Sequence, residues 1–219
     1  RGVSPALCGT KSELRAVVER RMKSDKQHQR DSGDRTQEVL VHIARYRLTL
    51  IPVVWRILFK GVRKNAVVKV LGRMEKAGLI QRLPLVHPQV YFILTSKTAR
   101  RFGRSQHWSQ PPGPQALPVD VATLYFCTGG TSRHERLSEQ EIRSMFPWLP
   151  GNSRQDVFCR PCSGDTGVLE WIRPDLGGPG HHMVRKCHRR LQTWMADSAF
   201  ASAADAERFR IVFLAPTVG

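Results

Sequence analysis

Two cysteines with the spacing Cys-x-x-Cys, Cys159 and Cys162, are the residues of this chain whose types and spacing point most directly to metal chemistry. Zinc knuckles use this spacing, because two thiolates about 2.3 Å from one ion need a tight turn between them. Zinc needs further ligands; the chain has no second Cys-x-x-Cys, and the possible completing ligands are His181, His182, Cys187 and His188. Cys187 falls on an apolar helical stripe and is explained as a small buried side chain. We therefore predict no metal and no other cofactor, with zinc at Cys159 and Cys162 as the alternative.

Two acidic residues, Asp156 and Glu170, fall on neighbouring predicted strands over residues 155–161 and 167–174. With the helices around them, these strands follow an α-β-β-α-β order that resembles the core of PD-(D/E)xK nucleases. Such enzymes hold Mg²⁺ with an Asp and a Glu-x-Lys and use it to activate water. Ile172 stands at the lysine position here, and Arg173 is out of phase along the strand. We predict a small α/β domain without enzyme activity; a degenerate nuclease-like fold is one alternative for this domain, and an active nuclease is another.

A predicted helix over residues 63–77 separates apolar from basic side chains. At about 100° per residue, one arc is apolar: Ala66, Val67, Val70, Leu71, Met74 and Ala77. The opposite arc is basic, with one amide: Asn65, Lys69, Gly72, Arg73 and Lys76. Arg63 and Lys64 stand at the N-terminus, where the helix dipole disfavours positive charge but a phosphate would favour it. Arg and Lys can pair with guanine and Asn with adenine, whereas Lys69, Arg73 and Lys76 suit phosphate contacts.

The net charge of +17 is concentrated in the segment that contains this helix. Residues 36–104 hold fourteen Lys/Arg and two Asp/Glu, a net charge of +12. Residues 105–219 hold twelve and eleven, a net charge of +1. A field of that sign attracts a polyanion, and double-stranded DNA is the partner that we expect first.

The elements around the basic helix predict a winged helix-turn-helix. A first helix is expected over residues 36–45, and a second begins near Thr49, which we expect to cap it, with Pro52 in its first turn. Lys60-Gly61 forms the turn, and Gly78 ends the basic helix. Strands over 79–83 and 89–94 follow, and the loop between them is the expected wing. His87 of this loop and Gln89 at the start of the second strand complete the predicted DNA-binding set.

The string LFKGVRKNAVVKVLGRMEKAGLIQRL, followed by VYFILTSKTARRFG, resembles the winged-helix part of the replication-relaxation family of plasmids and mobile elements. The resemblance covers residues 36–103, and the same layout occurs in many winged-helix repressors. It implies DNA binding in plasmid or mobile-element replication, mobilisation or transcriptional regulation.

The predicted fold class is α+β, with four parts along the chain. Residues 1–35 form a helix (10–23) and a flexible connector, 36–103 the winged-helix domain, and 104–118 a linker rich in Pro, Gly and Gln. Residues 119–219 form a small α/β domain. It begins with a strand or short helix at 119–127 and continues with a helix over 137–146 that has a capping box at Ser138 and Glu141. A long helix over 180–199 and a buried strand over 209–216 complete it.

The remaining expectations concern partners and location. Five cysteines without a dense framework suit a reducing compartment, and no apolar run approaches the roughly 20 residues of a membrane span. No signal peptide is recognised, so we expect a cytoplasmic protein without a membrane partner. A homodimer and proteins of a replication or relaxation complex are the further partners considered. A protein–protein adaptor in such a complex is the alternative to DNA binding.

Overall fold

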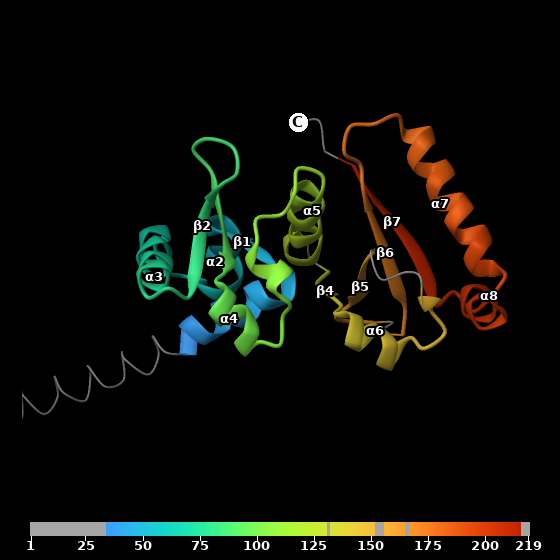
Figure 1. The fold of residues 1–219 in the computed structure, drawn as a ribbon, viewed down its shortest axis with the longest axis horizontal. Helices are drawn as coiled ribbons and strands as arrows, with labels where there is room; N and C mark the ends of the chain where they lie inside the picture. Colours follow the sequence, from blue (N-terminus) through green and yellow to red (C-terminus); the bar gives the residue numbers. More distant parts are fainter. Residues whose placement is uncertain (1–33, 131, 152–155, 165–166, 216–219) are drawn as a thin grey trace, which may run out of the picture.

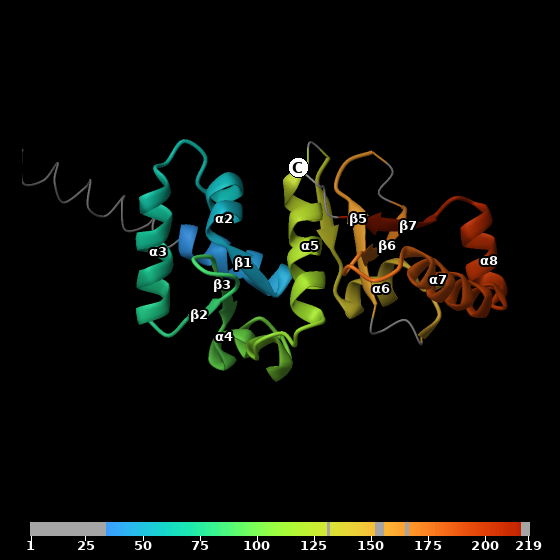
Figure 2. The same ribbon diagram turned by 90° about the horizontal axis from the view of Figure 1, so that it is seen from above.

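We describe the chain from a computed structural model, for residues 34–130, 132–151, 156–164 and 167–215. The fold class is mixed α+β, as predicted, with two small sheets on either side of helix α5 (Ala116–Gly129) (Figures 1 and 2). The predicted helix over 10–23 and the connector up to residue 33 lie outside the described residues. None of the described helices combines the length and apolar character that crossing a membrane requires.

The N-terminal half of the described chain follows the predicted order of elements. A helix over residues 34–46 is followed by α2 (Ile51–Leu58) and α3 (Lys64–Lys76), and then by β2 (Ile80–Pro84), β3 (Val90–Leu94) and α4 (Ser96–Arg101). Gly61 and Gly78 have positive φ angles of 77° and 67°, so both predicted glycine turns are confirmed. A short strand β1 (Leu48–Leu50), which was not predicted, joins the hairpin in an antiparallel sheet of order β1-β3-β2.

The predicted cap of the second helix is wrong. Thr49 lies inside β1 and is fully buried, and the residue that precedes α2 is Leu50, which makes no side-chain cap. The hydroxyl of Thr49 instead pairs with His42 Nε2 at 3.0 Å. Burial lowers the pKa of His42 to about 4, so this ring is neutral at pH 7.

The C-terminal half contains a second sheet of order β4-β5-β6-β7. Its elements are β4 (His134–Arg136), α6 (Glu139–Met145), β5 (Val157–Pro161), β6 (Leu169–Pro174), α7 (Gly180–Met195), α8 (Ser198–Asp205) and β7 (Phe209–Leu214). The predicted capping box of Ser138 and Glu141 and the antiparallel β5–β6 hairpin are both confirmed. β4 was not predicted.

Two other predicted elements of this half need correction. The helix expected over 180–199 ends at Met195, because Asp197 caps a new helix through the amides of Ala199 and Phe200. The last strand is β7, which pairs in parallel with β6 at the edge of the sheet. Because it is an edge strand, Phe213 is 45% exposed and the strand is not buried as expected.

Helix α5 separates the two sheets and packs against both (Figure 1). On one side Leu117, Val121 and Leu124 contact β1 and β3. On the other side Phe126 and Cys127 contact β5, β6 and β7. A helix that is covered on two sides is apolar around most of its circumference, which is why residues 119–127 could be predicted only as a strand or a short helix. The predicted linker over 104–118 holds the short 3-10 helix η1 (Gln106–Ser109) and the first residues of α5.

Ion pairs join the two halves beside α5. The carboxylate of Asp120 on α5 contacts Arg47 at 3.1 Å and Arg136 of β4 at 2.8 Å, and all three side chains are largely buried. Arg47 follows the first helix with a left-handed φ of 74°, a conformation usually left to glycine. Nearby, Arg45 donates to Glu141 at 2.6 Å. Partial burial raises the pKa of Glu141, but hydrogen bonds from Arg45 and Ser138 outweigh this effect and lower the pKa to about 2.

Candidate nucleic-acid interface

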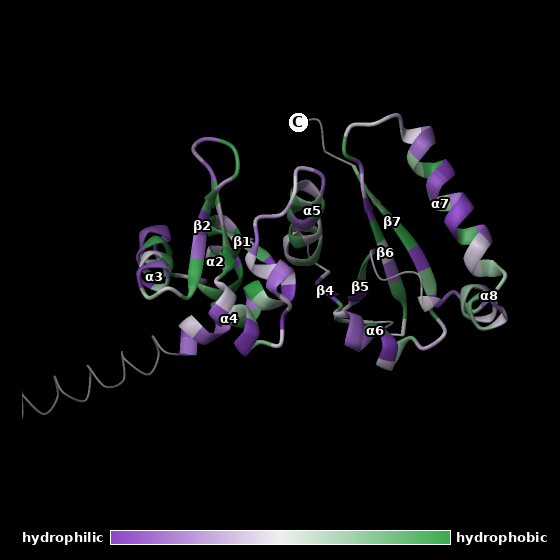
Figure 3. Cartoon of the chain, in the orientation of Figure 1, coloured by the Kyte–Doolittle hydropathy of each residue, from purple (hydrophilic) through white to green (hydrophobic). Residues whose placement is uncertain are grey.

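Helix α3 presents an exposed basic side opposite a buried apolar side, as the helical arcs predicted. Val67, Leu71 and Met74 are at most 2% exposed and pack against the first helix and α2. The eight residues predicted to bind DNA are all exposed: Arg63, Lys64, Asn65, Lys69, Arg73, Lys76, His87 and Gln89. Figure 3 shows α3 at one end of the molecule, with hydrophilic residues along its outer side. Ala77, expected on the apolar side, is exposed because the helix ends at Lys76.

A tight turn holds α3 against α2. The indole of Trp55 donates to the carbonyl of Val62 at 2.6 Å, and the amide of Val62 donates to Phe59 at 3.1 Å. Phe59 is 2% exposed and belongs to the core that α3 contacts. Between them Gly61 takes a positive φ, which a residue with a side chain would adopt only at a cost. The orientation of α3 therefore depends on apolar packing and on this turn.

The N-terminus of α3 carries uncompensated positive charge. Arg63 occupies the N-cap position without a side-chain cap, and the first turn contains no acidic residue. The helix dipole adds roughly half a positive charge at this end, next to Arg63 and Lys64. Backbone N–H groups at a helix N-terminus bind anions such as phosphate. This arrangement costs the free protein a few tenths of a kcal/mol and is favourable next to a polyanion.

The exposed side of α3 is hollowed at Gly72. Lys69, Gly72, Arg73 and Lys76 line an open hollow of about 610 Å³. A Cβ atom at position 72 would meet no atom beyond its own stretch of helix backbone within 4 Å, so the space next to the helix is open. Three cations around a residue without a side chain form a surface that a phosphate backbone can approach closely.

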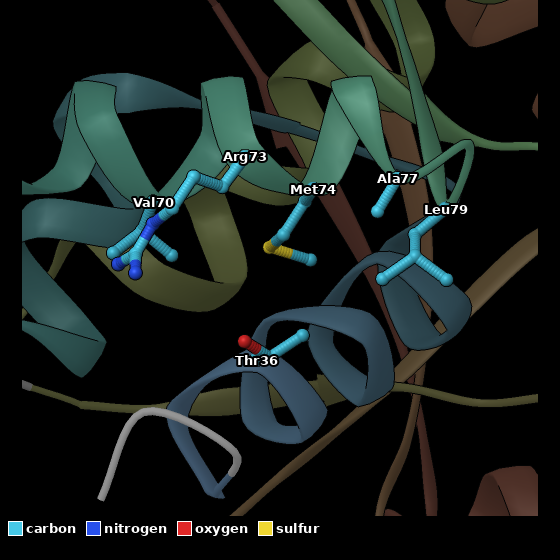
Figure 4. Close-up of a pocket in the computed structure, with 6 residues that line it drawn as sticks. All are labelled: Thr36, Val70, Arg73, Met74, Ala77 and Leu79. Atoms are coloured by element: carbon cyan, nitrogen blue, oxygen red, sulfur yellow. The ribbon is translucent and has the colours of Figure 1, made fainter. Parts of the chain in front are cut away.

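A smaller hollow of about 180 Å³ lies between the first helix and α3 (Figure 4). Its lining is mostly apolar: Thr36, Val70, Arg73, Met74, Ala77 and Leu79. Val70 and Met74 come from the packed side of α3 and Thr36 from the first helix, and we interpret the hollow as a gap at the joint of the two helices. The guanidinium of Arg73 lies at its rim and is exposed.

The β2–β3 hairpin places further polar residues beyond the helices. His87 and Gln89 are exposed in its loop, where the amide of Leu85 donates to the carbonyl of Gln89 at 3.0 Å. Figure 1 shows the loop of the hairpin extending beyond α3. Arg82 of β2 was missed by the sequence prediction. It is exposed although it shares a strand face with the buried Ile80, so strand alternation would have placed it towards the core and could not have identified it.

The cysteines considered for zinc lie in different surroundings. Cys159 of β5 is fully buried and its Sγ lies 3.4 Å from that of Cys127 on α5, whereas Cys162 is exposed. Burial raises the pKa of Cys159. Cys187 packs in the core on the α7 side of the sheet, away from the α5 side where Cys159 lies. Within the described ranges, no group of three His, Cys, Asp or Glu side chains is arranged to hold a metal ion.

The two acids of the nuclease-like pattern do not converge. Asp156 contacts Arg173 and Arg190, and so lies on the side of the sheet that α7 covers. Glu170 is a register neighbour of Cys159 and contacts His134 at 3.5 Å, on the α5 side. Burial raises the pKa of Glu170, while His134 and Arg210 act in the opposite direction. Asp156 and Glu170 therefore face opposite sides of one sheet and do not share a metal position.

Comparison with protein-family models, with characterised proteins and with solved structures found no match for this chain.

Proposed function

We propose that this protein binds double-stranded DNA, with α3 lying in the major groove and the β2–β3 hairpin acting as a wing. In this view residues 34–94 form a winged helix-turn-helix. The observation that carries the proposal is the exposed side of α3, where Lys69, Arg73 and Lys76 line the hollow at Gly72, opposite the buried side chains of Val67, Leu71 and Met74. A second support is the concentration of the net charge, with +12 carried by residues 36–104.

The proposal gives the residues of α3 two kinds of role. Arg63, Lys64 and Asn65 stand at the end of the helix that enters the groove in helix-turn-helix proteins, so they are the candidates for contacts with base edges. Lys69 and Arg73 are better suited to phosphates, which position the protein but specify no sequence. Lys76 and Arg82 extend the phosphate-facing surface, and the hairpin loop with His87 and Gln89 contacts the DNA beside it.

We extend the proposal to the biological process through the family resemblance alone. That resemblance favours replication, mobilisation or transcriptional regulation of a plasmid or mobile element. A homodimer would bind two half-sites about one helical turn apart, roughly 10 base pairs. An adaptor function would instead direct the same basic surface at an acidic protein.

The test is duplex binding by Lys69→Ala/Arg73→Ala over a range of salt concentrations. Each lost phosphate contact lowers the slope of log K against log salt by about 0.9, so the slope should fall by nearly two. At about 0.1 M salt the affinity should fall on the order of tenfold or more. Arg100→Ala/Arg101→Ala on α4 removes the same charge from the same half and serves as the matched control.

The outcomes separate a specific surface from general attraction. If α3 faces the DNA, the control keeps most of the affinity and the slope of the unmodified protein. Equal losses in both variants would mean that overall charge, and not α3, determines binding. A folded protein that binds no duplex at all would favour the adaptor alternative.

A further inference from the structure

Helix α7 carries a second basic surface at the other end of the molecule. Its inner stripe, Met183, Cys187, Leu191 and Trp194, packs against the second sheet. Arg185 and Arg189 project from the opposite side and are exposed, as is Lys186. The sixteen residues of α7 include no Asp or Glu. Arg185 and Arg189 are four residues apart, a spacing at which like charges repel by a few tenths of a kcal/mol.

The exposed cations of α7 are close together on one helix. This half has nearly balanced charges, with twelve Lys/Arg and eleven Asp/Glu over residues 105–219. Five of its ten described arginines are paired with a carboxylate: Arg136 with Asp120, Arg143 with Glu139, Arg160 with Glu135, and Arg173 and Arg190 with Asp156. In the described part of the chain, Arg185, Lys186 and Arg189 form no such pair, and neither do Arg133, Arg208 and Arg210, which lie outside α7. Unneutralised charge therefore gathers on one exposed helix face.

The two basic helices lie at opposite ends of the long axis of the molecule. Both views show α3 at one end, α7 at the other, and α5 with the two sheets between them (Figures 1 and 2). The buried ion pairs of Asp120 with Arg47 and Arg136 join the two halves beside α5. This arrangement holds the two basic surfaces apart, facing away from each other, so a straight duplex seated on α3 does not reach α7.

We propose that α7 binds the phosphate backbone of a second DNA segment, so that one molecule bridges two duplexes. The inference rests on the proposed binding of DNA by α3. We assign Arg185, Lys186 and Arg189 to phosphate contacts, which position a duplex without specifying its sequence. The contact should be weak alone and strongly dependent on salt, since it depends on counterion release from a few phosphates.

The test is a bridging assay with the full chain. A biotinylated duplex of about 30 base pairs, roughly three helical turns, is bound to beads, and capture of a second, fluorescent duplex is measured at about 0.1 M salt. The variant is Arg185→Gln/Arg189→Gln. Arg133→Gln/Arg143→Gln removes the same charge from the same half and is the control. Binding of a single duplex by each protein is measured in parallel, and circular dichroism checks that each is folded.

We expect the unmodified protein and the control to bridge the two duplexes. The α7 variant should lose bridging on the order of tenfold, while its affinity for a single duplex changes by less than about twofold. Full bridging by the α7 variant would overturn the inference, because two copies that each use α3 would then explain the bridge. A parallel loss of single-duplex binding would also overturn it, since α7 would then contact the same duplex as α3.

The same assay separates failure of the inference from failure of the proposed function. If the unmodified protein binds single duplexes through Lys69 and Arg73 but captures no second duplex, only the role of α7 is wrong. If it binds no duplex at all, the proposed function is wrong and the inference falls with it.

Discussion

Removing the carboxylate of Asp120 should be among the most destabilising single changes in this chain. Asp120→Ala leaves the guanidinium groups of Arg47 and Arg136 without their shared anion, which now lies 3.1 Å from one and 2.8 Å from the other. The Arg47 side chain is 7% exposed and its remaining contact is a 3.5 Å hydrogen bond to the carbonyl of His107. Arg136 keeps more contacts than Arg47, because its guanidinium also donates to the carbonyl of Tyr46 at 3.0 Å and stacks over the ring of Trp108.

The expected loss of stability follows from these contacts. Breaking a buried ion pair by removing one partner costs about 3–5 kcal/mol, mostly because the other charge stays buried and unpaired. We expect most of this cost to come from Arg47. Since domains have total stabilities of about 5–15 kcal/mol, the variant would be only marginally stable. With a urea m-value of about 2 kcal/mol/M, the unfolding midpoint should fall by roughly 1.5–2.5 M.

Urea unfolding followed by tryptophan fluorescence measures the effect, since Trp171 and Trp194 are buried in the core between the second sheet and α7. Asp205→Ala, an exposed aspartate at the end of α8, is the control and should stay within about 0.5 kcal/mol of the unmodified protein. In a double-mutant cycle, Arg47→Ala should cost less in the Asp120→Ala background than alone, by about 0.5–3 kcal/mol. A loss below about 1 kcal/mol for Asp120→Ala, or strict additivity in the cycle, would refute a stabilising role of this buried pair.

Three further expectations follow from single sites. Burial lowers the pKa of His42 from 6.5 to about 4, so the folded protein takes up this proton later than the unfolded chain does as the pH falls. The contribution of neutral His42 to the free energy of unfolding should therefore be fully present above about pH 6.5 and should fall by about 3 kcal/mol as the pH is lowered towards 4. Urea unfolding midpoints measured against pH should show a weaker pH dependence for His42→Gln than for the unmodified protein. Gly72→Ala should raise the free energy of unfolding by up to about 1 kcal/mol, because the site is helical and open. Gly78→Ala should lower it by about as much, because that residue has a positive φ. Changes of the same sign in the free energies of unfolding of the two variants would contradict this reasoning. In native thiol titration, Cys162→Ser should remove one fast-reacting equivalent and Cys159→Ser none, because only the former thiol is exposed; the reverse result would show that the β5 thiol is accessible.

Much of the N-terminal half could be predicted because its signals are local. The amphipathic arcs of residues 63–77, the glycines at 61 and 78 and the alternation of the two hairpin strands each depend on neighbours within a few residues, and each is found in the structure. The capping box of Ser138 and Glu141 is local for the same reason. DNA binding itself stays a prediction, supported by the exposure of the predicted residues.

The missed features depend on partners far away in the sequence. Strand β1 is only three residues long and forms because β3, about forty residues later, supplies its hydrogen bonds. Placed in that strand, Thr49 cannot cap α2. Asp156 and Glu170 were expected near each other from their places on adjacent strands, but strand register places them on opposite faces of the sheet.

By itself the sequence determined which residues are basic, that they gather over residues 36–104, and which side of α3 they occupy, because charge and helical period are properties of the local chain. Only the tertiary structure decided that α5 lies between two sheets, that a buried carboxylate at its start joins the halves, and that a second basic helix faces away from the first. These features depend on contacts between residues tens of positions apart, which become defined only when the elements pack and polar groups must find partners in the interior.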